Sequence, residues 1–112
     1  MDYQHIIVSA EAHVTTICLN RPESMNAINS AMHEELQAAF DDFAADDDQF
    51  IGVVTGAGGR AFCAGSDLKA IAEGGTHAGY PENGYAGLIE RFDLNKPLIA
   101  AVNGICLGGG FE

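Results

Sequence analysis

The chain has 112 residues, of which 16 are Asp or Glu and 5 are Lys or Arg, so its formal net charge is −11. This length allows one modest domain at most. The charge argues against nucleic acids and anionic membrane surfaces as partners, because both are bound through clustered Lys and Arg side chains. An apolar share of 47% predicts a globular protein rather than a disordered one.

Targeting signals and disulfide patterns are both missing from the sequence. The N-terminus lacks the basic stretch and the apolar core of a secretory signal, and no apolar run approaches the roughly 18 residues of a membrane span. Cys18, Cys63 and Cys106 are odd in number and widely spaced, which predicts free thiols. Neither they nor the histidines match a metal-binding spacing, so no metal is expected. We therefore expect a cytoplasmic protein.

The N-terminal elements follow from a change of hydrophobic period. The β-branched runs 6–9 and 14–19 predict an antiparallel hairpin. Apolar residues at helical spacing between Met32 and Phe43 then predict a helix that starts near Ser30, with Asn29 or Ser30 as its N-cap.

The second half alternates short strands with turns, which predicts an α/β fold. In chain order we expect an acidic turn at 46–48, a buried strand at 50–55, an extended stretch at 61–64, a short helix at 69–72, a mobile loop at 74–84, a helical turn at 88–92, and a buried strand at 98–102.

Glycines follow several of these strands. The segment 56–59 lacks the further glycine and the lysine of nucleotide-binding loops, so we interpret it as a turn. Ser66 lacks the flanking glycines of a nucleophile elbow, because Ala64 and Leu68 occupy those positions. Beside Gly65, however, the backbone N–H of Ser66 could approach a ligand oxygen, as an oxyanion hole requires.

The run Gly108–Gly110 allows two interpretations. Glycines at this density are typical of close backbone approach, and a helix that opens here would direct free N–H groups at an oxyanion. A plain flexible linker explains the same pattern.

Four segments, in this order, together resemble the enoyl-CoA hydratase/isomerase (crotonase) family: residues 20–27, 59–69, 96–104 and 107–112. The stretch 84–97, with Phe111, looks most like the carnitinyl-CoA dehydratase branch of that family. The resemblance covers essentially the whole chain. It implies a spiral of ββα units, of which residues 1–112 would be a single incomplete domain, the N-terminal portion truncated before the C-terminal half.

The resemblance also implies which residues form the site. Ser66 and Gly109 match the two backbone donors that bind the thioester oxygen of an acyl-CoA, and the Ser66 position needs only its N–H. Glu112 matches the first of two glutamates that share acid/base work, and the second falls beyond the chain. Residues that match or border the CoA-binding segments are Ser24, Ala64, Asp67 and Lys69, although Asp67 is also expected to cap the short helix.

The implied reaction is the addition of water to, or its removal from, an acyl-CoA thioester, as in fatty acid metabolism. Coenzyme A is part of the substrate, so no separate cofactor is expected. Members of the family usually form trimers or hexamers. Two alternatives stay open: an isomerase or carnitinyl-CoA dehydratase of the same family, and a catalytically inactive fragment that persists as a remnant or an assembly partner.

Overall fold

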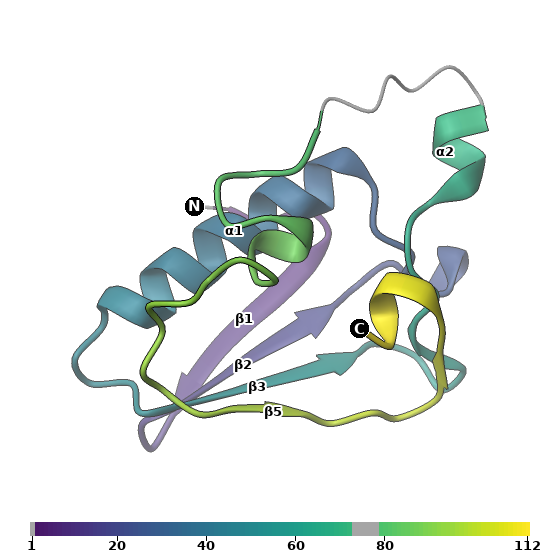
Figure 1. The fold of residues 1–112 in the computed structure, drawn as a ribbon. Coiled ribbons are helices and arrows are strands. Elements are labelled where there is room, and N and C mark those ends of the chain that lie inside the picture. Colours follow the sequence, from purple (N-terminus) through teal and green to yellow (C-terminus); the bar gives the residue numbers. More distant parts are fainter. Residues whose placement is uncertain (1, 73–78) are drawn as a thin grey trace.

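The computed structural model describes residues 2–72 and 79–112, which form a mixed α/β structure (Figure 1). Its strands and α-helices, in chain order, are β1 (Ile6–Glu11), β2 (Val14–Leu19), α1 (Ser30–Ala45), β3 (Ile51–Gly56), β4 (Ala61–Cys63), α2 (Leu68–Ala72), β5 (Leu98–Ala100) and β6 (Ile105–Cys106). Three short 3-10 helices are η1 (Pro22–Ser24), η2 (Tyr85–Gly87) and η3 (Gly108–Gly110).

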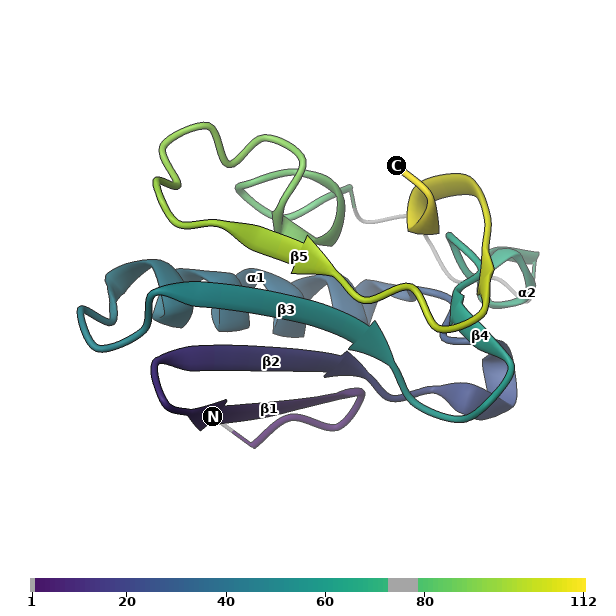
Figure 2. The same ribbon diagram turned by 90° about the horizontal axis from the view of Figure 1, so that it is seen from below.

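The main sheet has four strands in the order β1-β2-β3-β5 (Figure 2). β1 and β2 pair in antiparallel fashion, which confirms the predicted hairpin. β2, β3 and β5 are parallel, and α1 provides the crossover that a parallel β2–β3 pair requires. β4 and β6 form a separate parallel pair.

Helix α1 lies across one face of the main sheet and forms the core with it (Figure 1). On β2, alternate side chains such as Ile17 point towards the helix. From α1, side chains at helical spacing meet them, including Met32, Leu36 and Phe40, which are all 1% exposed or less. The predicted helix is confirmed, and Asn29 is its N-cap, because its side-chain oxygen accepts the N–H of Met32 at 2.9 Å.

Several predictions for the second half are wrong in detail. The strand expected at 98–102 is shorter, and Ile99 is 52% exposed rather than buried, because β5 is the edge of the sheet. The strand expected at 50–55 is half-buried over much of its length. The predicted extended stretch at 61–64 and short helix at 69–72 are confirmed as β4 and α2.

The helical turn expected at 88–92 is also misplaced. The structure has the 3-10 helix η2 at Tyr85–Gly87 instead, with only a hydrogen-bonded turn after it. Ala86 and Gly87 have φ angles of 57° and 64°, so this segment cannot continue as a right-handed helix. Of the mobile loop predicted at 74–84, residues 74–78 lie outside the described residues.

Candidate functional site

The pairing of β4 with β6 brings two distant loops together. Cys63 and Cys106 are register partners, and the N–H of Leu107 donates to the carbonyl of Cys63 at 3.1 Å. Because the two strands are parallel, the segments that follow them leave at the same edge. Residues 64–67 and 107–110 therefore lie side by side.

Gly65 allows the two loops to touch. Its φ is +95°, a conformation that side chains rarely adopt. A Cβ at this position would lie 3.0 Å from the carbonyl oxygen of Leu107 and 3.2 Å from the amide nitrogen of Gly109. Only glycine fits this contact without displacing the second loop.

The backbone of Ser66 is held by Ile28. The N–H of Ile28 donates to the carbonyl of Gly65 at 2.7 Å, and the N–H of Asp67 donates to the carbonyl of Ile28 at 2.9 Å. In such a bridge the N–H of the middle residue points away from the partner chain. Within the described ranges, the N–H of Ser66 has no protein acceptor.

The amide of Gly109, at the start of η3, likewise donates no hydrogen bond within the described residues. The N–H of Gly110 donates to Leu107 at 2.9 Å, and that of Phe111 donates to Gly108 at 3.0 Å. The N–H of Gly109, in the first turn, has no acceptor among the residues that the structure describes. The run of three glycines is thus an ordered turn, and close approach is the interpretation that holds: a Cβ on Gly110 would collide with the carbonyl of Cys63.

A pocket of ≈ 430 Å³ collects the three residues expected to act in catalysis. Ser66, Gly109 and Glu112 all line it, together with aromatic and aliphatic side chains from the 80–90 segment, namely Tyr80, Tyr85 and Ile89. Glu90 adds a second carboxylate to the wall. The pocket lining thus includes two residues whose backbone N–H groups have no acceptor in the described ranges, and two residues with carboxylate side chains.

The residues expected near the CoA lie outside this pocket. Arg21 connects two of them: its guanidinium pairs with Asp67 at 2.9 Å and contacts the Ser24 hydroxyl at 3.4 Å. The N–H of Ala64, which is half-buried, donates to Met25 at 3.1 Å. Lys69 is exposed on α2. Ser24 follows β2, Ala64 and Asp67 follow β4, and Lys69 is on α2. None of the four lines the pocket.

Asp67 caps α2, as the sequence predicts, by accepting the N–H of Ala70 at 2.9 Å. This hydrogen bond and the pairing with Arg21 lower the pKa of its carboxyl group, although burial opposes them. Because this carboxylate already has structural partners in Ala70, Arg21 and the backbone of Lys69, it is poorly placed to act on a substrate.

Tyr85 is one of the pocket residues from the 80–90 segment that sequence reasoning did not predict. Its hydroxyl lies 3.0 Å from the Ser66 hydroxyl, so the Ser66 side chain has a partner of its own. Burial raises the pKa of Tyr85, and nearby Cys63, Tyr80 and Glu112 add to the effect, while the hydrogen bond with Ser66 opposes it. The stretch 84–97 stands out in the sequence only through its resemblance to the carnitinyl-CoA dehydratase branch, and that resemblance assigns no role to Tyr85.

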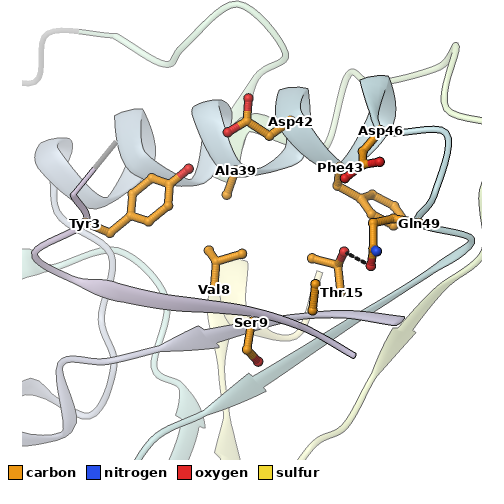
Figure 3. Close-up of a pocket in the computed structure, with 10 residues that line it drawn as sticks. Tyr3, Val8, Ser9, Thr15, Ala39, Asp42, Phe43, Asp46 and Gln49 are labelled. Atoms are coloured by element: carbon orange, nitrogen blue, oxygen red, sulfur yellow. Dashed lines mark hydrogen bonds between the residues drawn. The ribbon is translucent and has the colours of Figure 1, made fainter. Parts of the chain in front are cut away.

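A second cavity, of ≈ 360 Å³, opens between α1 and the β1–β2 hairpin (Figure 3). Tyr3, Asp42 and Asp46 line it, and the Thr15 hydroxyl donates to the Gln49 side chain at 2.6 Å across its wall. None of the site residues expected from the sequence lines this cavity. In residues 2–72 and 79–112, moreover, no group of three His, Cys, Asp or Glu side chains could hold a metal ion, and no helix is long and apolar enough to cross a membrane.

Comparison with known families decides the relationship of this chain. Residues 9–112 match the family model described as enoyl-CoA hydratase/isomerase. The chain belongs to this family. Among curated relatives, the carnitinyl-CoA dehydratase of Proteus mirabilis (strain HI4320) is 46% identical over 110 residues, which are 97% of this chain and 42% of that protein. The carnitinyl-CoA dehydratase of Salmonella arizonae is 48% identical over 100 residues, 88% of this chain and 38% of that protein.

Solved structures of the family support the same relationship. The crystal structure of carnitinyl-CoA hydratase from Mycobacterium avium matches with a TM-score of 0.87 and 42% identity, over 97% of this chain and 42% of that one. An enoyl-CoA hydratase from Mycobacterium tuberculosis H37Rv matches with a TM-score of 0.81 and 38% identity, over 96% and 41%. The predicted crotonase-like α/β fold is confirmed, and the chain spans about 42% of the length of the relatives named first. That residues 1–112 are a single incomplete domain stays a prediction.

Proposed function

We propose that Ser66, Gly109 and Glu112 are the acyl-CoA site of a hydratase or dehydratase. The observation that carries the proposal is that Ser66 and Gly109, whose amides have no protein acceptor in the described residues, line one pocket together with Glu112. Family membership and the carnitinyl-CoA dehydratase relatives support a lyase reaction on an acyl-CoA.

The chemistry matches these groups. In hydration the water loses a proton and its oxygen bonds to the β-carbon of a 2-enoyl thioester, while the thioester oxygen carries the negative charge. The α-carbon then takes a proton from a second acid, the role that the family resemblance gives to the second of its two glutamates. Fixed N–H donors stabilise that charge without reorganising. Glu112 takes the proton from the water, and in dehydration it returns a proton to the leaving hydroxyl group. Coenzyme A enters with the substrate, so the proposal includes no separate cofactor.

Binding of an anionic CoA by a chain of net charge −11 requires local positive charge. Lys69 is exposed on α2, close in sequence to Ser66, and the family resemblance matches it to a position whose side chain can approach the CoA. We therefore assign the CoA contact to Lys69, with Ser24 and Ala64 bordering it. The three free thiols support a reducing, cytoplasmic location. For the full protein we propose the trimeric or hexameric assembly that is usual in the family.

The test is a comparison of Glu112→Gln with Glu34→Gln in the full encoded protein. Crotonyl-CoA hydration and carnitinyl-CoA dehydration are followed through the absorbance of the conjugated thioester. Glu34 is an exposed carboxylate on α1 and serves as the matched control. We expect Glu112→Gln to lose about 10²- to 10⁴-fold in kcat, and Glu34→Gln to keep wild-type rates. Equal rates for both variants would refute the role of Glu112.

A second candidate, an inactive chain of these 112 residues, is favoured by the exposed apolar side chains near the C-terminal end. Phe92, Leu107 and Phe111 are 87%, 58% and 80% exposed, and an apolar cavity of ≈ 220 Å³ opens beside Phe111. Surface of this kind is left where packing partners are lacking. Purified residues 1–112 with cooperative unfolding and measurable turnover would exclude this candidate.

A further inference from the structure

Tyr85 contacts both Ser66 and Gly109, the two residues proposed as backbone donors. Its hydroxyl is 3.0 Å from the Ser66 hydroxyl. At Gly109, a Cβ would lie only 2.4 Å from the same Tyr85 oxygen and 2.3 Å from the adjacent ring carbon, so the ring rests directly on the glycine. The phenol group is therefore placed between the two loops that supply the amides.

The position of Tyr85 is fixed from helix α1. The N–H of Ala86 donates to Nδ1 of the His33 ring at 3.0 Å, and that ring meets the Tyr85 ring edge-on, with 4.7 Å between the centroids. Asn83 and Gln37 exchange two hydrogen bonds, of 2.9 and 2.7 Å. A hydroxyl group held this firmly loses little freedom when a ligand binds.

The hydroxyl group also has a proton to offer. Burial raises the pKa of Tyr85 above its ordinary value of 10.0, so the phenol is protonated at neutral pH. The Ser66 hydroxyl can donate to the phenol oxygen, which leaves the phenol proton free for another acceptor. An acyl oxygen bound by the amides of Ser66 and Gly109, the two residues that Tyr85 contacts, would be such an acceptor.

We propose that the Tyr85 hydroxyl is a third hydrogen-bond donor to the thioester oxygen, oriented by Ser66 Oγ and by packing on Gly109. This inference rests on the proposed function, because it requires an acyl thioester in the pocket. It also gives the Ser66 side chain a task beyond that of its amide. A donor aimed at the developing negative charge acts more strongly in the transition state than on the bound substrate, so its loss lowers kcat more than it raises KM.

The test combines kinetics with vibrational spectroscopy in the full encoded protein. Butyryl-CoA labelled with ¹³C at the thioester carbon has no double bond to hydrate, and its infrared C=O band moves to lower frequency as hydrogen bonds to the oxygen strengthen. We compare wild type, Tyr85→Phe, Ser66→Ala, the double variant, and Tyr3→Phe as a matched control at a tyrosine of the other cavity.

We expect Tyr85→Phe to bind butyryl-CoA, to shift the band less than wild type, and to lose about 10²-fold in kcat on crotonyl-CoA with KM nearly unchanged. Ser66→Ala should also reduce the band shift and kcat, but by less than Tyr85→Phe does. Combining it with Tyr85→Phe should cause no further change. Tyr3→Phe should match wild type.

The outcomes separate this inference from the proposed function. If wild type shifts the band and Tyr85→Phe shifts it equally, with equal kcat, the third donor is refuted while the two amides stand. If wild type does not bind butyryl-CoA, or binds it without any shift, the proposed function fails and this inference fails with it.

Discussion

Arg21 and Asp67 form an ion pair in which Nη2 and Oδ2 are 2.9 Å apart, and their side chains are only 12% and 11% exposed. The pair joins the loop after β2 to the loop that carries Ser66. Arg21 also donates to the carbonyl of Ala27, just before the residue that bridges to Ser66. The position of the Ser66 amide therefore depends on a contact between residues 46 positions apart.

We expect Asp67→Asn to lower the free energy of unfolding by about 1.5–3 kcal/mol at neutral pH, because hydrogen bonds to a charged group are lost. The pKa of Asp67 is lowered in the fold, chiefly by the N–H of Ala70 and further by Arg21. Its contribution is therefore present above the ordinary value of 3.8 and disappears as the pH falls through the lower value of the folded state.

Urea unfolding at several pH values checks this prediction. The stability difference between wild type and Asp67→Asn should shrink as the pH drops below about 4. Asp93→Asn, at an exposed carboxylate, is the control and should stay close to wild type near neutral pH. A difference that is constant down to pH 2 would contradict the linkage.

Asn26 is completely buried and connects three backbone segments. Its side-chain nitrogen donates to the carbonyls of Ala57 and Ala61, each at 3.0 Å, and its oxygen accepts the N–H of Arg21 at 2.8 Å. Asn26→Ala leaves these buried groups unsatisfied, so we expect a loss of about 3 kcal/mol or more. Chemical denaturation measures the loss, and Asn95→Ala, at an exposed asparagine, should cost less than about 0.5 kcal/mol.

Gly87 packs against the backbone of α1. It has a φ of +64°, and a Cβ there would lie 2.5 Å from the Cα of Gln37. We expect Gly87→Ala to cost about 2 kcal/mol or more and to loosen the segment that holds Tyr85. Gly59→Ala is the matched control, because a Cβ at Gly59 would have no neighbouring atom within 4 Å. Thermal unfolding, with hydrogen exchange at residues 83–88, distinguishes them; equal effects of both variants would contradict the prediction.

The N-cap of α1 offers a test between two neighbouring residues. Asn29 caps the helix, whereas Ser30 is exposed at its first position. We expect Asn29→Ala to lower the free energy of unfolding by about 1 kcal/mol and Ser30→Ala by less than about 0.5 kcal/mol. The denaturation midpoints of the two variants check this prediction. A larger loss for Ser30→Ala than for Asn29→Ala would mean that Ser30 is the N-cap.

Much of the fold could be predicted because it depends on local patterns. The hairpin of β1 and β2, the helix at Ser30–Ala45 and the short strand at Ala61–Cys63 each follow from side-chain periodicity and turn residues. The exposure of β5 could not be predicted in this way, since Leu98–Ala100 is as apolar as a buried strand and only its place at the sheet edge leaves it open. Likewise, the turn at η2 depends on positive φ angles at Ala86 and Gly87, and Gly87 lies against the backbone of α1, which no local pattern shows.

By itself, the sequence determined the family, the α/β pattern and the residues expected at the site. Each of these follows from patterns of neighbouring side chains and from glycine-containing segments in a given order along the chain. Only the tertiary structure decided that Ser66 and Gly109 line one pocket, that Arg21 is neutralised by Asp67, and that Tyr85 lies on Gly109. These contacts join residues about 20 to 50 positions apart, and their geometry depends on how strands and loops pack in three dimensions, which no local periodicity encodes.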